Sequence, residues 1–155
     1  TLVWAVWGVY RPGMKISDVL RTKGTEVVTI RPDESVTRLL EVLADRRVGA
    51  LVVSPDGAAV AGIVSERDVV RHLHQKGAAV LSTPVSEIMT SDVTTCAVDD
   101  SVESLARTMT DRRIRHVPVV IDGRLEAIVS IGDIVKSRID SLQAERDQLV
   151  EYIQQ

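Results

Sequence analysis

Two nine-residue stretches share one pattern: GIVSERDVV at residues 62–70 and AIVSIGDIV at residues 127–135. Each has a short apolar run, which predicts a strand, followed by Ser-x-x-Asp. A serine with an acidic residue three positions later is typical of the first turn of a helix. Asp68 and Asp133 stand 65 residues apart. The sequence therefore predicts the same strand-to-helix corner twice.

The similarity continues on both sides of these corners. ESVTRLLEVLADRRVGALVV at residues 34–53 matches DSVESLARTMTDRRIRHVPVV at residues 100–120, with Ser35 and Ser101 66 residues apart. Upstream, ISDVL at residues 16–20 resembles VSEIM at residues 85–89. An internal repeat of this length indicates a duplicated structural unit.

Apolar periodicity gives both repeats the same order of elements, strand, helix, strand, strand, helix. In the first repeat we expect strands at 27–30, 50–53 and 60–64, a helix that Ser35 caps, and a helix at 66–74. In the second we expect strands at 93–96, 117–121 and 125–129, a helix after Ser101, and a helix from residue 131. A single three-stranded unit leaves one sheet face uncovered and is too small to be stable alone. We therefore predict an α/β (α+β) fold, in which two βαββα repeats pack as a pseudo-two-fold pair within the chain.

These patterns predict four segments along the chain. Residues 1–13 are a leader, or a segment foreign to the native protein, and lie outside the fold. Residues 14–80 form the first repeat, 81–140 the second, and 141–155 a C-terminal helical tail. Two interpretations of the tail stay open, a solvated extension or a dimer contact.

Composition disfavours several classes of partner. The formal net charge is −3, and the aromatic residues, Trp4, Trp7, Tyr10 and Tyr152, lie near the two ends. Nucleic-acid binding usually needs cationic surface and aromatic faces on which bases stack. No apolar run approaches the roughly 20 residues of a membrane helix, and the lone Cys96 suits a reducing compartment. We expect a cytoplasmic protein that binds neither nucleic acid nor membrane.

The repeated Ser-x-x-Asp admits two interpretations. It can be a capping box, in which Ser and Asp satisfy each other's backbone N–H groups. However, Asp is shorter than Glu or Gln, which leaves its carboxylate free to turn outward. Free N–H groups at a helix start attract anions, and a carboxylate beside a hydroxyl can accept hydrogen bonds from the vicinal hydroxyls of a ribose. We predict nucleoside-binding chemistry at both corners.

These motifs resemble the cystathionine-β-synthase (CBS) domain family, as a tandem pair of the stand-alone bacterial type, often called a Bateman module. The resemblance rests on GIVSERD, AIVSIGD, the two DRR segments, RHVPVV at residues 115–120 and the helix start from Pro32 to Val36. The second helix start departs from the pattern, with Val98 in place of Pro32. The family implies clefts that bind AMP, ADP, ATP, NAD or S-adenosylmethionine, and assembly as a homodimer.

The resemblance also assigns roles to residues. Asp68 and Asp133 would hold ribose hydroxyls, with the help of Ser65 and Ser130. The adenine would be surrounded by Thr29, Thr95, Gly49, Ala50, His116 and Val117. The cations expected near phosphate are Arg67, Arg115 and His116, with Lys136 and Arg71 further out. Because Gly132 replaces Arg67 in the second repeat, we expect the two sites to differ in phosphate affinity.

The leading hypothesis is a regulatory nucleotide sensor without catalytic activity, acting in signal transduction through dimer geometry or an unknown partner protein. One alternative is a structural dimerisation domain with no ligand. The other is a nucleotide-processing enzyme, which the sequence disfavours because no phosphate-binding Gly-rich loop, paired nucleophile and base, or metal cluster is recognisable. Catalytic and metal sites are therefore not expected, and Cys96 is interpreted as a small buried residue.

Overall fold

The computed structural model describes residues 13–155, which form two compact units. We call residues 26–95 with Pro118–Ile128 the sheet unit, and residues 13–25 with Cys96–Val117 and Val129–Gln155 the helical unit. Nearly all of the predicted leader, residues 1–12, lies outside the described part of the chain.

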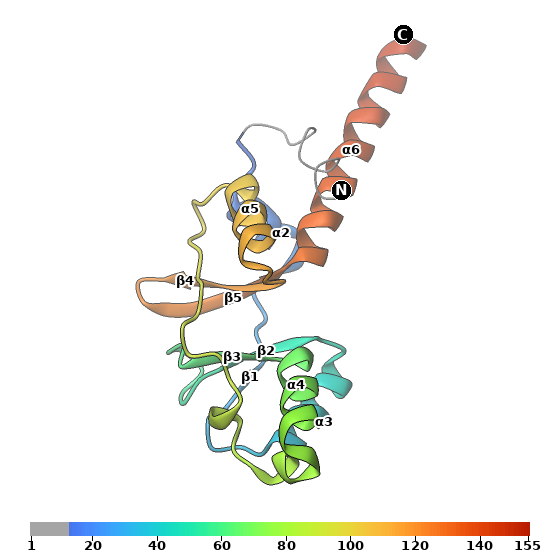
Figure 1. Cartoon of the computed structure of the whole chain (residues 1–155). Helices are drawn as coiled ribbons and strands as arrows, with labels where there is room; N and C mark the ends of the chain where they lie inside the picture. The colour runs from blue at the N-terminus through green and yellow to red at the C-terminus, as the bar shows by residue number, and fades with distance from the viewer. Residues whose placement is uncertain (1–12) are drawn as a thin grey trace. The chain divides into compact units, whose positions relative to one another are not determined.

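The sheet unit contains a three-stranded sheet in the order β1-β2-β3. Strand β1 (Thr29–Ile30) runs parallel to β2 (Ala50–Val53), and β2 runs antiparallel to β3 (Gly62–Ser65). Helices α3 (Val36–Arg46) and α4 (Glu66–Lys76) lie on one side of this sheet (Figure 1). Two 3-10 helices follow, η1 (Gly77–Ser82) and η2 (Val85–Glu87).

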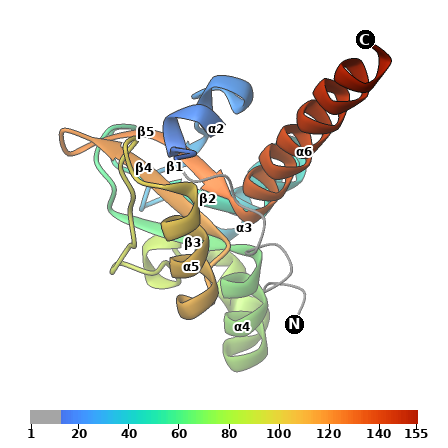
Figure 2. The same cartoon turned by 90° about the horizontal axis from the view of Figure 1, so that it is seen from above.

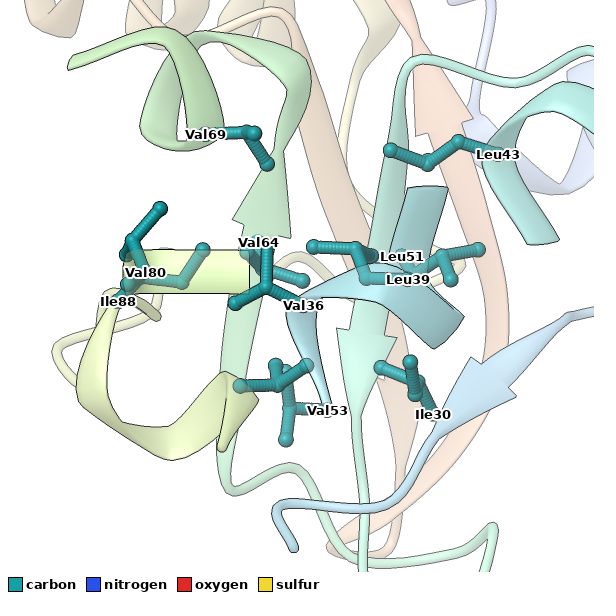
Figure 3. Packing of buried hydrophobic residues seen from close by; sticks show 11 residues of the cluster. Ile30, Val36, Leu39, Leu43, Leu51, Val53, Val64, Val69, Val80 and Ile88 are labelled. Carbon is teal, nitrogen blue, oxygen red and sulfur yellow. The ribbon is translucent and has the colours of Figure 1, made fainter. Parts of the chain in front are cut away.

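One apolar cluster holds the sheet unit together. The side chains of Leu39 on α3, Leu51 on β2 and Val64 on β3 are buried and lie next to one another (Figure 3). Burying one such aliphatic side chain contributes roughly 1.5–3 kcal/mol. The cluster fixes where β3 ends and α4 begins, since Val64 and Val69 flank that corner.

The helical unit consists of α2 (Ile16–Lys23), α5 (Val102–Arg112) and α6 (Ile131–Gln154). Both α2 and α5 contact α6. Their inward faces carry buried apolar residues, among them Val19, Met109 and Ile134. The C-terminal half of α6 extends past the ends of α2 and α5 (Figures 1 and 2). The predicted tail is therefore helical and continuous with the last helix of the second repeat.

Matching backbone hydrogen bonds confirm the internal repeat. Ile16 N donates to Asp100 O at 3.0 Å in the helical unit, and Val85 N donates to Glu34 O at 2.8 Å in the sheet unit. The segment that precedes the first repeat's strands thus packs with the helices of the second repeat. In this respect it occupies the place that residues 83–92 occupy in the sheet unit.

The second repeat departs from the expected strands in one place. The predicted strand at 93–96 is wrong, because only an isolated bridge forms there, at Cys96, while Thr95 is exposed. Cys96 alone is buried in this stretch, so alternate side chains do not hold the segment against a sheet. Strands β4 (His116–Ile121) and β5 (Arg124–Ser130) form a two-stranded sheet joined by a turn at Asp122 and Gly123. In the first repeat β1 is also shorter than predicted.

Candidate functional site

The first predicted corner lies in the sheet unit, where β3 ends at Ser65 and α4 begins. Ser65 N and Ser65 Oγ both donate to Asp68 Oδ2, at 2.8 and 3.0 Å, and Asp68 N donates back to Ser65 Oγ at 3.4 Å. Glu66 N donates to Gly49 O at 3.0 Å. Because Ala50 pairs with Ser65 across β2 and β3, Gly49 and Ala50 lie beside the corner.

The second corner, in the helical unit, repeats this geometry. Ser130 N and Oγ donate to Asp133 Oδ2 at 2.8 and 2.9 Å, and Asp133 N donates to Ser130 Oγ at 3.2 Å. Ile131 N donates to Arg115 O at 2.9 Å, which is the counterpart of the bond to Gly49 O. Arg115 and the adjoining His116 and Val117 therefore lie beside Asp133.

The expectation that the shorter Asp would leave both carboxylates turned outward is wrong. Both close capping boxes, because the extended serine before the helix brings its own N–H within reach of even a short acid at the third helical position. Only Oδ2 is used in this way. Among residues 13–155, Oδ1 of Asp68 and of Asp133 accepts no hydrogen bond. Within the described part of the chain, each carboxylate therefore has one oxygen without a hydrogen-bond donor.

The two carboxylates differ in their charged surroundings. Lys23 Nζ, at the end of α2, donates to Asp133 Oδ2 at 2.5 Å, and both side chains are about one quarter exposed. Burial acts to raise the pKa of Asp133, but the hydrogen bonds from Lys23 and Ser130 and the charge of Lys23 together hold this pKa below its ordinary value of 3.8. Asp133 is therefore ionised at neutral pH.

A solvent-open hollow lies beside Asp133 in the helical unit. It is lined by Val19, Thr22, Lys23, Asp133, Lys136, Ser137 and Asp140. The sequence predicted Asp133 and, as an outer cation, Lys136. It missed Lys23, Thr22 and Ser137, which lie outside the repeated motif.

The other predicted contact residues differ in whether they lie near a corner. Thr29 is on β1, paired with Val52, in the same sheet as the corner at Asp68. Thr95 is exposed and outside any regular strand, so its predicted match with Thr29 as a first-strand residue is wrong. Arg67 and Arg71 are exposed on α4.

Other sequence interpretations concern catalysis and metals. Cys96 is buried, as predicted, and this burial together with the charge of Asp100 raises the pKa of its thiol to about 12. A thiol that stays protonated is a poor nucleophile. Among residues 13–155, no three His, Cys, Asp or Glu side chains come together as metal ligands. No helix in that range combines the length and apolar character needed to cross a membrane.

Comparisons with known proteins identify the repeats. The family model of the CBS domain matches residues 13–75 and 85–140. The CBS domain-containing protein CBSX3, mitochondrial, of Arabidopsis thaliana is 36% identical over 147 residues, which are 90% of this chain and 71% of that protein.

Solved structures similar to this chain also contain CBS domains. The CBS-domain containing protein ATU1752 from Agrobacterium tumefaciens is 42% identical with a TM-score of 0.78, over 81% of this chain and 99% of that one. The CBS domain pair of protein MJ0100, in complex with 5-methylthioadenosine and S-adenosyl-L-methionine, is 26% identical with a TM-score of 0.71, over 81% and 95%. The chain therefore belongs to the CBS domain family, with two repeats that carry the paired Ser-x-x-Asp corners.

Proposed function

We propose that this chain is a regulatory module that binds an adenine nucleotide or a related adenosyl compound and has no catalytic activity of its own. CBS domain pairs are regulatory modules, and the MJ0100 pair was solved with two adenosyl compounds. The observation that carries the proposal is that, at both helix starts, only Oδ2 of Asp68 and of Asp133 accepts hydrogen bonds from residues 13–155, so Oδ1 has no donor in that range.

The chemistry of these corners suits a ribose. An ionised carboxylate accepts hydrogen bonds but donates none, so it favours ligands rich in hydroxyl groups. The N-terminal turns of α4 and α6 add a partial positive charge that favours a nearby anion such as phosphate. The capping bonds to Oδ2 hold each carboxylate in place, so Oδ1 is positioned before a ligand arrives.

The ribose contact is common to AMP, ADP, ATP, NAD and S-adenosylmethionine, and we propose this class as the regulatory ligand. Gly49, Ala50 and Thr29 would lie on the adenine side of one site, and His116 and Val117 on that of the other. Arg67 and Arg115 are the proposed phosphate contacts. Since Gly132 stands where the first repeat has Arg67, the two sites would differ in phosphate affinity.

For the output we propose a cytoplasmic homodimer that transmits the ligand state to a partner protein. Helix α6 exposes an apolar stripe, defined here as Val135, Ile139, Leu142, Leu149 and Ile153, each at least 40% exposed. These positions are spaced by four, three, seven and four residues. That spacing is the heptad pattern of helices that pair along one face, with Arg146 at the skipped position. A second copy supplies the same stripe, so the proposed occupant is another molecule of this chain.

A thermal-shift panel with AMP, ADP, ATP, NAD and S-adenosylmethionine tests the ligand proposal. A ligand at a hundred times its dissociation constant stabilises the folded state by about 2.7 kcal/mol. At least one member of the panel is expected to raise the melting temperature accordingly. An unchanged melting temperature with all five compounds would support the structural dimerisation domain instead. Conversion of a nucleotide during incubation, followed by chromatography, would support the enzyme.

A further inference from the structure

The proposed ribose carboxylate, Asp133, lines the hollow in the helical unit together with two lysines. Lys23 reaches Asp133 from α2, and Lys136 stands on α6 within the same lining. Asp133 is reached by a lysine 110 residues away in the sequence. The carboxylate of Asp68, in contrast, accepts only from its own capping serine among the described residues.

We infer that Lys23 makes the Asp133 site selective for phosphorylated ribonucleosides over unphosphorylated ones. This inference rests on the proposed function and names the ligand class of one of its two sites. Lys23 is the specificity-determining residue, and Lys136 adds a second positive charge to the same hollow.

The selectivity follows from competition for one carboxylate. The ammonium of Lys23 satisfies part of the negative charge of Asp133, which weakens Asp133 as an acceptor for the hydroxyls of a neutral nucleoside. A nucleoside phosphate brings an anion of its own into the hollow. Lys23 can then form charge-assisted hydrogen bonds with that phosphate while Asp133 holds the ribose. For the phosphorylated ligand, the contact between Lys23 and phosphate compensates for the weaker hydrogen bonds between Asp133 and the ribose. A neutral nucleoside has no such compensation.

Comparison of the two repeats finds no lysine at the sequence position that corresponds to Lys23. The match of residues 16–20 with 85–89, extended along the chain, places Asp92 at the position of Lys23. The matching hydrogen bonds of Ile16 and Val85 support this alignment. Aligned in this way, the sequence has an acid where the other segment has the lysine, although residues 88–92 do not continue as a helix as α2 does. Any cation for phosphate near Asp68 must come from elsewhere, and Arg67 on the same helix is the proposed source.

One residue of the hollow opposes the selectivity. Asp140 lies one helical turn beyond Lys136 on α6 and lines the same space. Its negative charge disfavours a phosphate nearby. Neutralising it by Asp140→Asn is therefore expected to strengthen AMP binding and to leave adenosine binding unchanged.

Calorimetric titration with AMP and with adenosine tests the inference. The Asp68→Asn variant serves as the background, so that binding reports on the Asp133 site. In this background Lys23→Met is expected to lower the ratio of AMP to adenosine affinity by about tenfold, the range of one charge-assisted contact. Lys23→Arg, which keeps the charge, should retain most of the preference. Lys76→Met, which removes an exposed lysine from α4, is the matched control and should change nothing.

The outcomes separate the inference from the proposed function. If both ligands bind and Lys23→Met leaves their affinity ratio unchanged, Lys23 does not select for phosphate and the inference is overturned. If Lys23→Met weakens AMP and adenosine equally, the lysine acts only on the fold, and the inference is overturned as well. Circular dichroism melts of each variant identify that case independently. If wild-type protein binds neither AMP nor adenosine nor any other adenosyl compound, the proposed function itself fails.

Discussion

The ammonium of Lys23 lies 2.5 Å from the carboxylate of Asp133 at the first turn of α6. This ion pair connects the last residue of α2 to the capping box of α6. It links the first helix of the first repeat to the proposed ligand corner of the second.

The ion pair predicts a pH dependence of stability. The pKa of Asp133 is below 3.8 in the folded chain, whereas an unfolded Asp titrates near 3.9. Its ionisation therefore stabilises the fold above about pH 4, and this contribution is lost as the pH falls through the lower, folded value. Asp133→Asn should be less stable than wild type by on the order of 1 kcal/mol at pH 7, and the gap should narrow below about pH 4. Urea unfolding between pH 3 and 7 measures this, and a gap that stays constant would show that charge is not its source.

Two helix ends predict a gain in stability. Arg47 and Arg113 are the C-caps of α3 and α5, and both have a φ of 55° in the left-handed region. A side chain there costs about 1 kcal/mol relative to glycine. Arg47→Gly and Arg113→Gly should each raise the free energy of unfolding by about that amount. Ala44→Gly, at an exposed position of α3, is the control and should lower the free energy of unfolding by about 1 kcal/mol. A loss of stability in both cap variants would contradict the strain argument.

The apolar stripe of α6 predicts self-association. Leu142→Glu and Leu149→Glu place charges within the stripe and should shift the chain from dimer to monomer in analytical ultracentrifugation. Gln143→Glu introduces the same charge beside the stripe, at an exposed position of the same helix, and should leave the dimer intact. Sedimentation of wild-type chain as a monomer at micromolar concentration would remove the proposed role of the stripe.

The fold was largely predictable because both repeats carry the same sequence pattern of strands and helices. Ser35 and Ser101 cap α3 and α5, as the repeated helix starts predict, with Arg38 N and Ser104 N donating to their hydroxyls. The strand predicted at 93–96 failed because its Val and Thr residues favour strands locally, whereas strand formation depends on a neighbour. The packing of α2 on α6 could not be predicted, since residues 16–20 and 85–89 carry the same local pattern.

The site was predictable only where the repeats agree. Ser-x-x-Asp identified both corners, and the alternative interpretation as a capping box was confirmed for Oδ2 of both acids. Lys23 was not identified as a site residue, because comparing the repeats emphasises residues that they share. The residue that corresponds to Lys23 in the sequence is Asp92. Its partner Asp133 is also 110 residues away in the sequence, and sequence patterns do not predict contacts at such a separation.

In the proposed function, Asp68 and Asp133 hold the hydroxyls of a ribose through Oδ1. The most direct test is calorimetric titration of the wild-type chain with AMP and with 2′,3′-dideoxy-AMP, which differ only in those hydroxyls. We expect AMP to bind at least about tenfold more tightly, since one lost hydrogen bond to a charged group is worth about 1.5–3 kcal/mol. The Asp68→Asn, Asp133→Asn double variant should lose this preference. Equal affinities of the wild-type chain for the two nucleotides would contradict the claim.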